Sequence, residues 1–152
     1  MANPVCEVLI TEARLESPET GVDWSAGAIV DFWGVVRKLE DGREIDGIDY
    51  EAHTAMAEHQ LRLVAEEASG IFQLVRILIQ HRIGLVRAGE ASLFLRITAE
   101  HRAAAFSGGQ WVVDELKRRV PIWKRPRFKI GDPITGVGNA GPRSVPAATT
   151  AP

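Results

Sequence analysis

The chain contains very little cysteine and lacks the residue patterns that hold metals. Cys6 is the only cysteine in 152 residues, which excludes an internal disulfide, and its apolar, strand-like surroundings favour a buried structural thiol. There is no Cys pair and no H-E-x-x-H motif, and His53 and His59 are six positions apart, on different sides of a helix. We therefore expect no metal ion and no resident cofactor.

Long hydrophobic runs are missing as well. No apolar stretch approaches the roughly 18 residues that a membrane-spanning helix needs. The N-terminal region carries Glu7 and Glu12 and no basic segment, so we expect no signal peptide. With a single cysteine, these features predict a cytoplasmic protein without a membrane partner.

Signals for nucleotide and nucleic-acid binding are weak. Residues 107–109 (Ser-Gly-Gly) interrupt a helical pattern, and no lysine follows them, so they do not form a phosphate-binding loop. Trp123 and Phe128 lie among basic residues and could stack on bases. The chain as a whole is acidic, with 18 basic and 20 acidic side chains, and shows no nucleic-acid-binding fold signature, so we expect no nucleic-acid partner.

Hydrophobic periodicity predicts a single α+β domain with a mixed or antiparallel sheet and two main helices. Five strands are expected at 5–10, 24–37, 45–53, 74–80 and 91–98, and a further extended segment at 122–130. Helices are expected at 54–69, capped by Thr54 and stopped by Gly70, and at 103–119, ended by Pro121. The link between the strands at 74–80 and 91–98 is expected to be hairpin-like.

The domain is expected to cover residues 1–130 and to be followed by a tail, residues 131–152. Gly, Pro, Ala and Thr dominate this tail, and Arg143 is its only charged side chain after Asp132. Such a composition buries little surface, which predicts a segment that is mobile or used against a partner.

A cationic segment is the most informative part of the sequence. Residues 115–129 contain seven basic side chains and one acid, whereas the rest of the chain has 11 basic and 19 acidic side chains. A local excess of this kind suits a phosphate, a carboxylate or an acidic partner. An ordinary solvated run of charges remains the alternative.

Within this segment Lys117 is the leading candidate for chemistry. It flanks the apolar stripe of the second helix, with its stem against apolar surface and its amine at a cleft edge, where it could act as nucleophile, proton donor or anion clamp. The alternative is a lysine favoured by the helix dipole. His101 and Arg102 precede the same helix and could bind an anion or simply form a cap region. Arg37 ends a strand next to a loop and is either a further ligand contact or an ordinary surface residue.

Several motifs occur in an order that resembles one known family, the MoaE family of large, catalytic molybdopterin synthase subunits. The motifs span residues 26–125, about two-thirds of the chain. They are Phe32-Trp33-Gly34-Val35-Val36-Arg37, Tyr50-Glu51-Ala52-His53 with Met56-Ala57, His81-Arg82-Ile83-Gly84 with Gly89-Glu90, His101-Arg102 with Ala105-Phe106, Leu116-Lys117 and Pro121-Ile122-Trp123-Lys124-Arg125.

The resemblance implies a hammerhead-like α/β fold and a sulfurtransferase activity. Such enzymes convert cyclic pyranopterin monophosphate to molybdopterin by inserting two sulfurs as a dithiolene, in molybdenum cofactor biosynthesis. The sulfur arrives as a thiocarboxylate on the C-terminal Gly-Gly of a small, ubiquitin-like subunit, MoaD-like, whose tail threads into a pocket. A homodimer with one small subunit at each end, a heterotetramer, is implied.

The resemblance also implies roles for six residues. Lys117 and Lys124 correspond to the family's catalytic lysines. The implied substrate-binding residues are Arg37, His101 and Arg102, with Arg125 beside Lys124.

The sequence departs from the family pattern in two places. Pro126 stands where the family commonly has an acid, and the family's C-terminal tryptophan-containing stretch is not recognisable in 131–152. These departures leave open an alternative function, a catalytically impaired MoaE-like binding module that retains partner contact.

Overall fold

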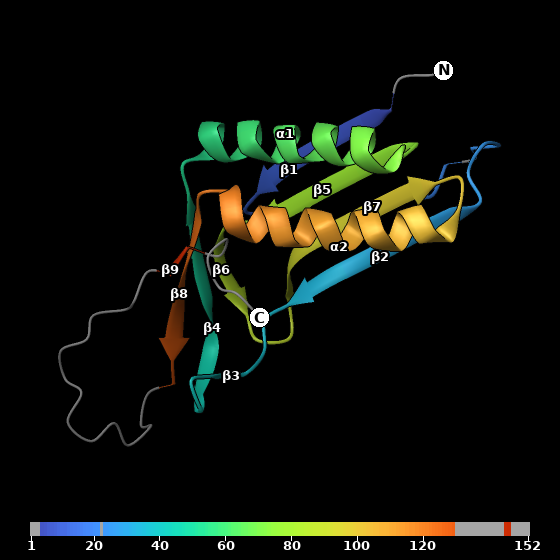
Figure 1. Ribbon diagram of the computed structural model, residues 1–152. Coiled ribbons are helices and arrows are strands. Elements are labelled where there is room, and N and C mark those ends of the chain that lie inside the picture. Colours follow the sequence, from blue (N-terminus) through green and yellow to red (C-terminus); the bar gives the residue numbers. More distant parts are fainter. Residues whose placement is uncertain (1–3, 22, 130–144, 147–152) are drawn as a thin grey trace.

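Two helices pack against one sheet, and a second sheet meets it near the end of the second helix. The computed structural model describes residues 4–21, 23–129 and 145–146 (Figure 1). Within these residues there are two helices and nine strands. The α+β class expected from the sequence is confirmed.

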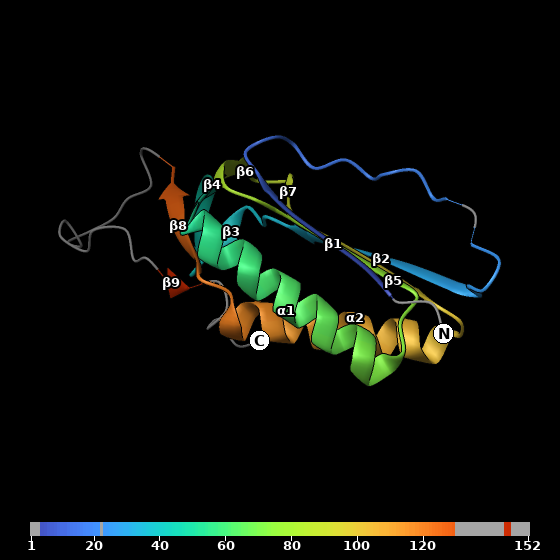
Figure 2. The ribbon, with the colours of Figure 1, turned by 90° about the horizontal axis from the view of Figure 1, so that it is seen from above.

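The larger sheet has the strand order β1-β5-β7-β2 and carries the helices on one face (Figure 2). Its strands are β1 (Val5–Thr11), β2 (Ala28–Val35), β5 (Arg76–Arg82) and β7 (Ala91–Ala99). β1 runs parallel to β5, and the other pairs are antiparallel, so the sheet is mixed as predicted. β7 is central and is buried along nearly its whole length, which matches its continuous apolar run.

The second sheet is built around a long strand, β4 (Arg43–Ala52). β4 pairs with β8 (Ile122–Phe128) on one side and with β6 (Gly84–Arg87) on the other, all antiparallel. The two-residue strand β3 (Leu39–Glu40) pairs with the start of β4, and β9 (Val145–Pro146) pairs with β8. The pairing of β4 with β8 matters for the site because it fixes where Lys124 lies.

The helices are α1 (Thr54–Phe72) and α2 (Arg102–Arg119). Two details of α1 were predicted wrongly. His53, not Thr54, caps its first turn, with Nδ1 accepting from the Met56 amide at 3.4 Å. Gly70 does not end the helix, because Gln73 supplies the left-handed C-cap at φ 55°.

The helix α2 matches its expected range closely. Gly108 and Gly109 lie inside it and are buried, as expected for a helical segment rather than a phosphate loop. A Cβ at Gly108 would approach Leu74 to 3.3 Å, so this glycine allows α2 to pack closely against Leu74, in the segment that joins α1 to β5.

The link between β5 and β7 is more elaborate than the expected hairpin. β5 and β7 do pair, but the connection contains β6, which leaves the larger sheet and adds to β4. Because β6 follows β5 directly, the chain passes from the larger sheet to the second sheet just after His81. The strands β3, β6 and β9, which have two to four residues each, were not predicted.

The expected tail, 131–152, lies largely outside the described residues. The exception is β9, whose Val145 and Pro146 pair with Lys124 and Trp123. Neither of the described helices is long and apolar enough to cross a membrane.

Candidate anion-binding site

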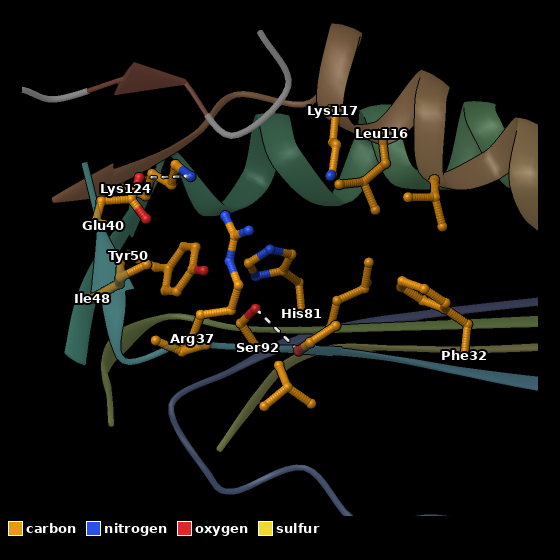
Figure 3. Close-up of a pocket in the computed structure, with 15 residues that line it drawn as sticks. Phe32, Arg37, Glu40, Ile48, Tyr50, His81, Ser92, Leu116, Lys117 and Lys124 are labelled. Atoms are coloured by element: carbon orange, nitrogen blue, oxygen red, sulfur yellow. Dashed lines mark hydrogen bonds and ion pairs between the residues drawn. The ribbon is translucent and has the colours of Figure 1, made fainter. Parts of the chain in front are cut away.

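A cavity of about 430 Å³ opens where the end of α2 meets both sheets (Figure 3). Its wall includes three basic side chains and one acid, with apolar and neutral polar groups between them. The lining residues are Phe32, Gly34, Val35, Val36, Arg37, Glu40, Ile48, Tyr50, His81, Ser92, Leu93, Val113, Leu116, Lys117 and Lys124.

Lys117 enters the cavity from the last turn of α2. Its neighbour Leu116 is buried and holds this turn against the core, which leaves Lys117 at the boundary of the apolar stripe, as predicted. The ammonium points into the cavity in Figure 3. Among the described residues, Lys117 forms no ion pair.

Lys124 enters from β8, a strand that follows α2 after Pro121. It lies directly opposite Tyr50 of β4, and directly opposed residues of an antiparallel pair share a face of the sheet. Ile48 lies on this face as well and lines the cavity with them. The Lys124 ammonium is 3.6 Å from a carboxylate oxygen of Glu40, and both side chains are less than one-fifth exposed, at 18% and 19%.

Arg37 enters from the segment that follows β2. The backbone beside it is fixed, because the Val36 amide donates to Glu90 at 3.0 Å and the Gly89 amide donates to Val36 at 2.8 Å. Its guanidinium points towards the side of the cavity where Lys117 lies (Figure 3). No ion pair joins Arg37 to another residue within the described part of the chain. Three cations therefore converge on one cavity, of which only Lys124 has an ion-pair partner in the described part of the chain.

Neutral polar groups form the deep side of the cavity. His81 is 3% exposed, and its Nδ1 is 2.8 Å from the Arg82 carbonyl oxygen, which can only accept, so Nδ1 carries the proton and Nε2 is left as an acceptor. Burial lowers the pKa of His81 to about 4, with the Arg82 hydrogen bond opposing the shift. The imidazole is therefore neutral at pH 7 and adds no charge to the site.

Tyr50 packs edge-on against His81, with ring centroids 5.3 Å apart. Burial raises the pKa of the Tyr50 phenol, a hydrogen bond with Ser92 opposes that shift, and the nearby Glu40 carboxylate adds to it. The Ser92 hydroxyl also donates to the Gly34 carbonyl at 3.4 Å. The phenol therefore stays protonated at neutral pH, and these groups line the cavity without adding to its formal charge.

Most basic side chains of the 115–129 segment are paired with acids. Six of the seven are in ion pairs, four of them between β8 or the residue after it and the β3–β4 hairpin. The pairs are Arg118–Glu115, Arg119–Glu67, Lys124–Glu40, Arg125–Glu51, Arg127–Asp49 and Lys129–Glu44. The site is therefore a small cavity and not a charged face.

Three of the six candidate residues lie outside this cavity. Arg125 is one position from Lys124, so it points to the opposite face of β8, where it is 3.5 Å from Glu51. His101 and Arg102 are at the start of α2, and a helix rise of about 1.5 Å per residue puts them roughly 22–24 Å from Lys117 along the axis. Their predicted contact with the ligand stays a prediction.

Sequence reasoning overlooked the four polar residues Glu40, Tyr50, His81 and Ser92. The alternation of β4 could have placed Tyr50 on an inward face. No sequence pattern predicted that Glu40 lies at the site. Its contact with Lys124 depends on the β3–β4 hairpin and on the pairing of β4 with β8.

The arrangement is suited to binding an anionic ligand of small-molecule size. The three cations and one carboxylate of the lining give a formal charge of +2 in a partly enclosed space. A low-dielectric wall strengthens such interactions relative to open solvent. The described residues contain no group of three or more His, Cys, Asp or Glu that could hold a metal ion.

The sequence model described as "MoaE protein" matches residues 9–119. The chain belongs to the MoaE family. Relatives named molybdopterin synthase catalytic subunit include one from Oryza sativa subsp. indica, 42% identical over 110 residues, which are 72% of this chain and 57% of the relative.

Other MoaE relatives with the same name come from an archaeon and a bacterium. The Pyrococcus abyssi protein is 43% identical over 66% of this chain and 68% of its own length, and the Escherichia coli protein is 37% identical over 70% and 71%. The match covers little more than half of the rice relative, whose sequence extends well beyond it.

Solved structures support the same fold. The MoaE protein from Burkholderia ambifaria aligns with a TM-score of 0.72 at 23% identity, over 97% of this chain and 93% of that one. Molybdopterin synthase from Staphylococcus aureus aligns with a TM-score of 0.69 at 24% identity, over 87% and 96%. At these identities the likeness concerns the fold alone.

Proposed function

We propose that this MoaE chain is the catalytic subunit of a molybdopterin synthase. It transfers sulfur from a thiocarboxylated, ubiquitin-like small subunit to cyclic pyranopterin monophosphate and so forms the dithiolene of molybdopterin. The observation that carries the proposal is the convergence of Arg37, Lys117 and Lys124 in one cavity of ligand size.

The charge of the cavity fits both reactants. The substrate carries a phosphate and the sulfur donor carries a thiocarboxylate, so two anions must be held close together during transfer. Mutual repulsion opposes that approach unless cations lie between them. A formal charge of +2, with two cations unpaired among the described residues, offsets this repulsion.

We assign different tasks to the two lysines. Lys117 has no carboxylate partner within the described residues, so its ammonium is available to stabilise charge that develops at the reacting carbon and sulfur. After loss of a proton, its neutral amine could instead form a transient covalent link. Lys124 is held beside Glu40 at 3.6 Å and binds the phosphate or the thiocarboxylate. Arg37 supplies a fork for the second anion.

The positions of His101 and Arg102 bear on the assembly. Within one chain they are too far from Lys117 to touch the same small ligand. If they bind this substrate, they do so from a second copy, which agrees with the homodimer and heterotetramer implied by the family. A solved structure from Helicobacter pylori, a complex of subunits 1 and 2 of molybdopterin-converting factor, has a related fold, with a TM-score of 0.62 at 20% identity.

The competing function is a binding module without catalysis. Pro126, which replaces the family's usual acid, favours it. The deciding experiment mixes the purified chain, the thiocarboxylated small subunit and the pyranopterin precursor, and measures molybdopterin formed. Product formation over many turnovers supports the synthase, whereas binding of both ligands without product supports the module.

A further inference from the structure

One acid lies inside the cationic cavity, and neither sequence motifs nor the family resemblance pointed to it. Glu40 ends the short strand β3, and the next two residues, Asp41 and Gly42, have φ of 51° and 76°. Two residues of positive φ make the tight turn that joins β3 to β4, and this turn fixes the backbone of Glu40 beside the cavity.

The contact between Glu40 and Lys124 leaves the lysine able to bind a ligand. At 3.6 Å the pair is longer than a hydrogen bond, so the attraction is mainly coulombic. An ammonium has three N–H donors, and a single carboxylate at this distance does not use them all. Since the two side chains are largely covered, screening by solvent is weaker than at an open surface.

We propose that Glu40 is a positioning residue for Lys124. Its carboxylate holds the ammonium at the β3 side of the cavity in the orientation that sulfur transfer requires, and it limits the formal charge of the empty cavity to +2. The proposal rests on the proposed function for its catalytic part, while its electrostatic part concerns the empty protein.

The geometry of β8 allows the positioning role to be tested, because the carboxylate lost from Glu40 can be supplied again from position 126. Pro126 is two positions from Lys124, and residues two apart in a strand share a face. Pro126 lies opposite Ile48, and Lys124 lies opposite Tyr50, both on the cavity side of β4. A glutamate at position 126 therefore places a carboxylate beside Lys124 from its own strand.

The experiment compares E40Q with two double variants, E40Q/P126E and E40Q/P126Q. In E40Q we expect kcat to fall roughly tenfold and inorganic phosphate to bind several-fold more tightly at low salt, because a competing carboxylate is gone. E40Q/P126E should recover most of the lost kcat. E40Q/P126Q should not, because it changes the backbone in the same way without adding charge.

Either of two results would overturn the positioning role: an unchanged kcat in E40Q, or equal recovery of kcat in E40Q/P126E and E40Q/P126Q. Melting temperatures identify a variant that fails to fold, and E40D, which keeps the charge on a shorter stem, then replaces E40Q and should show a partial loss.

Failure of the proposed function gives a different pattern, in which the unchanged protein transfers no sulfur. Glu40 is then judged by two measurements on the empty protein, phosphate affinity and the ¹⁵Nζ resonance of Lys124. Both should change in E40Q, and the Lys117 resonance serves as the internal control. If neither changes, the pairing has no consequence and the proposal is wrong.

Discussion

Lys117 of α2 and Arg37 of the segment after β2 project into the same cavity, and neither has an ion-pair partner among the described residues. The other six basic side chains of the 115–129 segment are in ion pairs with acids, so Lys117 is the exception within it. Two like charges that share a cavity repel each other, and an anionic ligand relieves that repulsion. The free protein is therefore prepared for an anion at this point.

The first prediction concerns Lys117. Lys117→Ala should lower sulfur transfer by at least about a hundredfold, because removal of a charge at the reacting atoms raises the barrier. The melting temperature should stay nearly unchanged, since the side chain is exposed and makes no ion pair with a described residue. Single-turnover measurement of molybdopterin formation gives the rate.

Arg118→Ala is the matched control for Lys117. Arg118 is the next residue on the same turn and is 70% exposed, where it pairs with Glu115. Its removal should change the rate less than about twofold, as expected for a surface ion pair. Near-normal turnover in Lys117→Ala would remove the central assignment.

The second prediction concerns binding. Arg37→Ala and Lys124→Ala should each weaken precursor affinity by about 1.5–3 kcal/mol, the usual cost of a lost charge-assisted contact. Calorimetry at two salt concentrations measures this, and the loss should be larger at low salt. Lys129→Ala, which removes a cation in an exposed ion pair with Glu44 just after β8, is the control and should bind the precursor nearly as well. Equal affinities in all three variants would exclude the cavity as the phosphate site.

The third prediction follows from the lowered pKa of His81. The unfolded chain takes up a proton on this histidine below its ordinary pKa of 6.5, whereas the folded chain does so only near its pKa of about 4. Acid therefore favours the unfolded state. The contribution is fully present above about pH 6.5 and is lost as pH falls towards 4, by about 3 kcal/mol in total.

Denaturant titrations between pH 4 and 7.5 can measure this contribution. His81→Gln cannot take up the proton and should flatten the dependence of unfolding free energy on pH across that window. His59→Gln, a change at an exposed histidine, should leave the dependence as it is. If the unfolding free energy depends on pH in the same way in the His81 variant and the unchanged protein, burial does not hold this imidazole neutral.

The sequence was sufficient for the elements that have long periodic patterns. The apolar residues of the main strands and of both helices recur with the period of each element, so these elements could be predicted. The same periodicity placed Lys117 next to the buried Leu116, at the edge of the apolar stripe of α2. The short strands β3 and β6 could not be predicted, because a few residues carry no period. The meeting of Glu40 with Lys124 depends on one of these strands, so it was beyond sequence reasoning as well.

The fourth prediction tests the junction that β6 makes with β4. A Cβ at Gly47 would lie 2.4 Å from the Val86 carbonyl oxygen and 2.9 Å from the Arg87 Cα, both backbone atoms. Gly47→Ala should therefore separate the strands and destabilise the fold by about 1–3 kcal/mol. Thermal unfolding measures the effect. Gly70→Ala makes the same change inside α1 with nothing within 4 Å, and should be neutral or stabilising by up to about 1 kcal/mol.

The last prediction concerns the start of α2. His101 and Arg102 are too far from Lys117 to share its ligand in one chain, so a contribution to the same site requires a second copy. Arg102→Ala and Lys117→Ala should each be nearly inactive as separate homodimers. When the two variants are unfolded and refolded together, mixed dimers form, in which one of the two sites has both intact residues.

Random mixing should make half of the dimers mixed, each with one working site in two, so activity should return to about a quarter of the normal value. Light scattering must show a dimer before and after mixing. If activity does not return, or if the chain is a monomer, His101 and Arg102 do not act in this cavity. Their predicted contact with the substrate would then be wrong, while the assignments of Arg37, Lys117 and Lys124, which meet within one chain, would be unaffected.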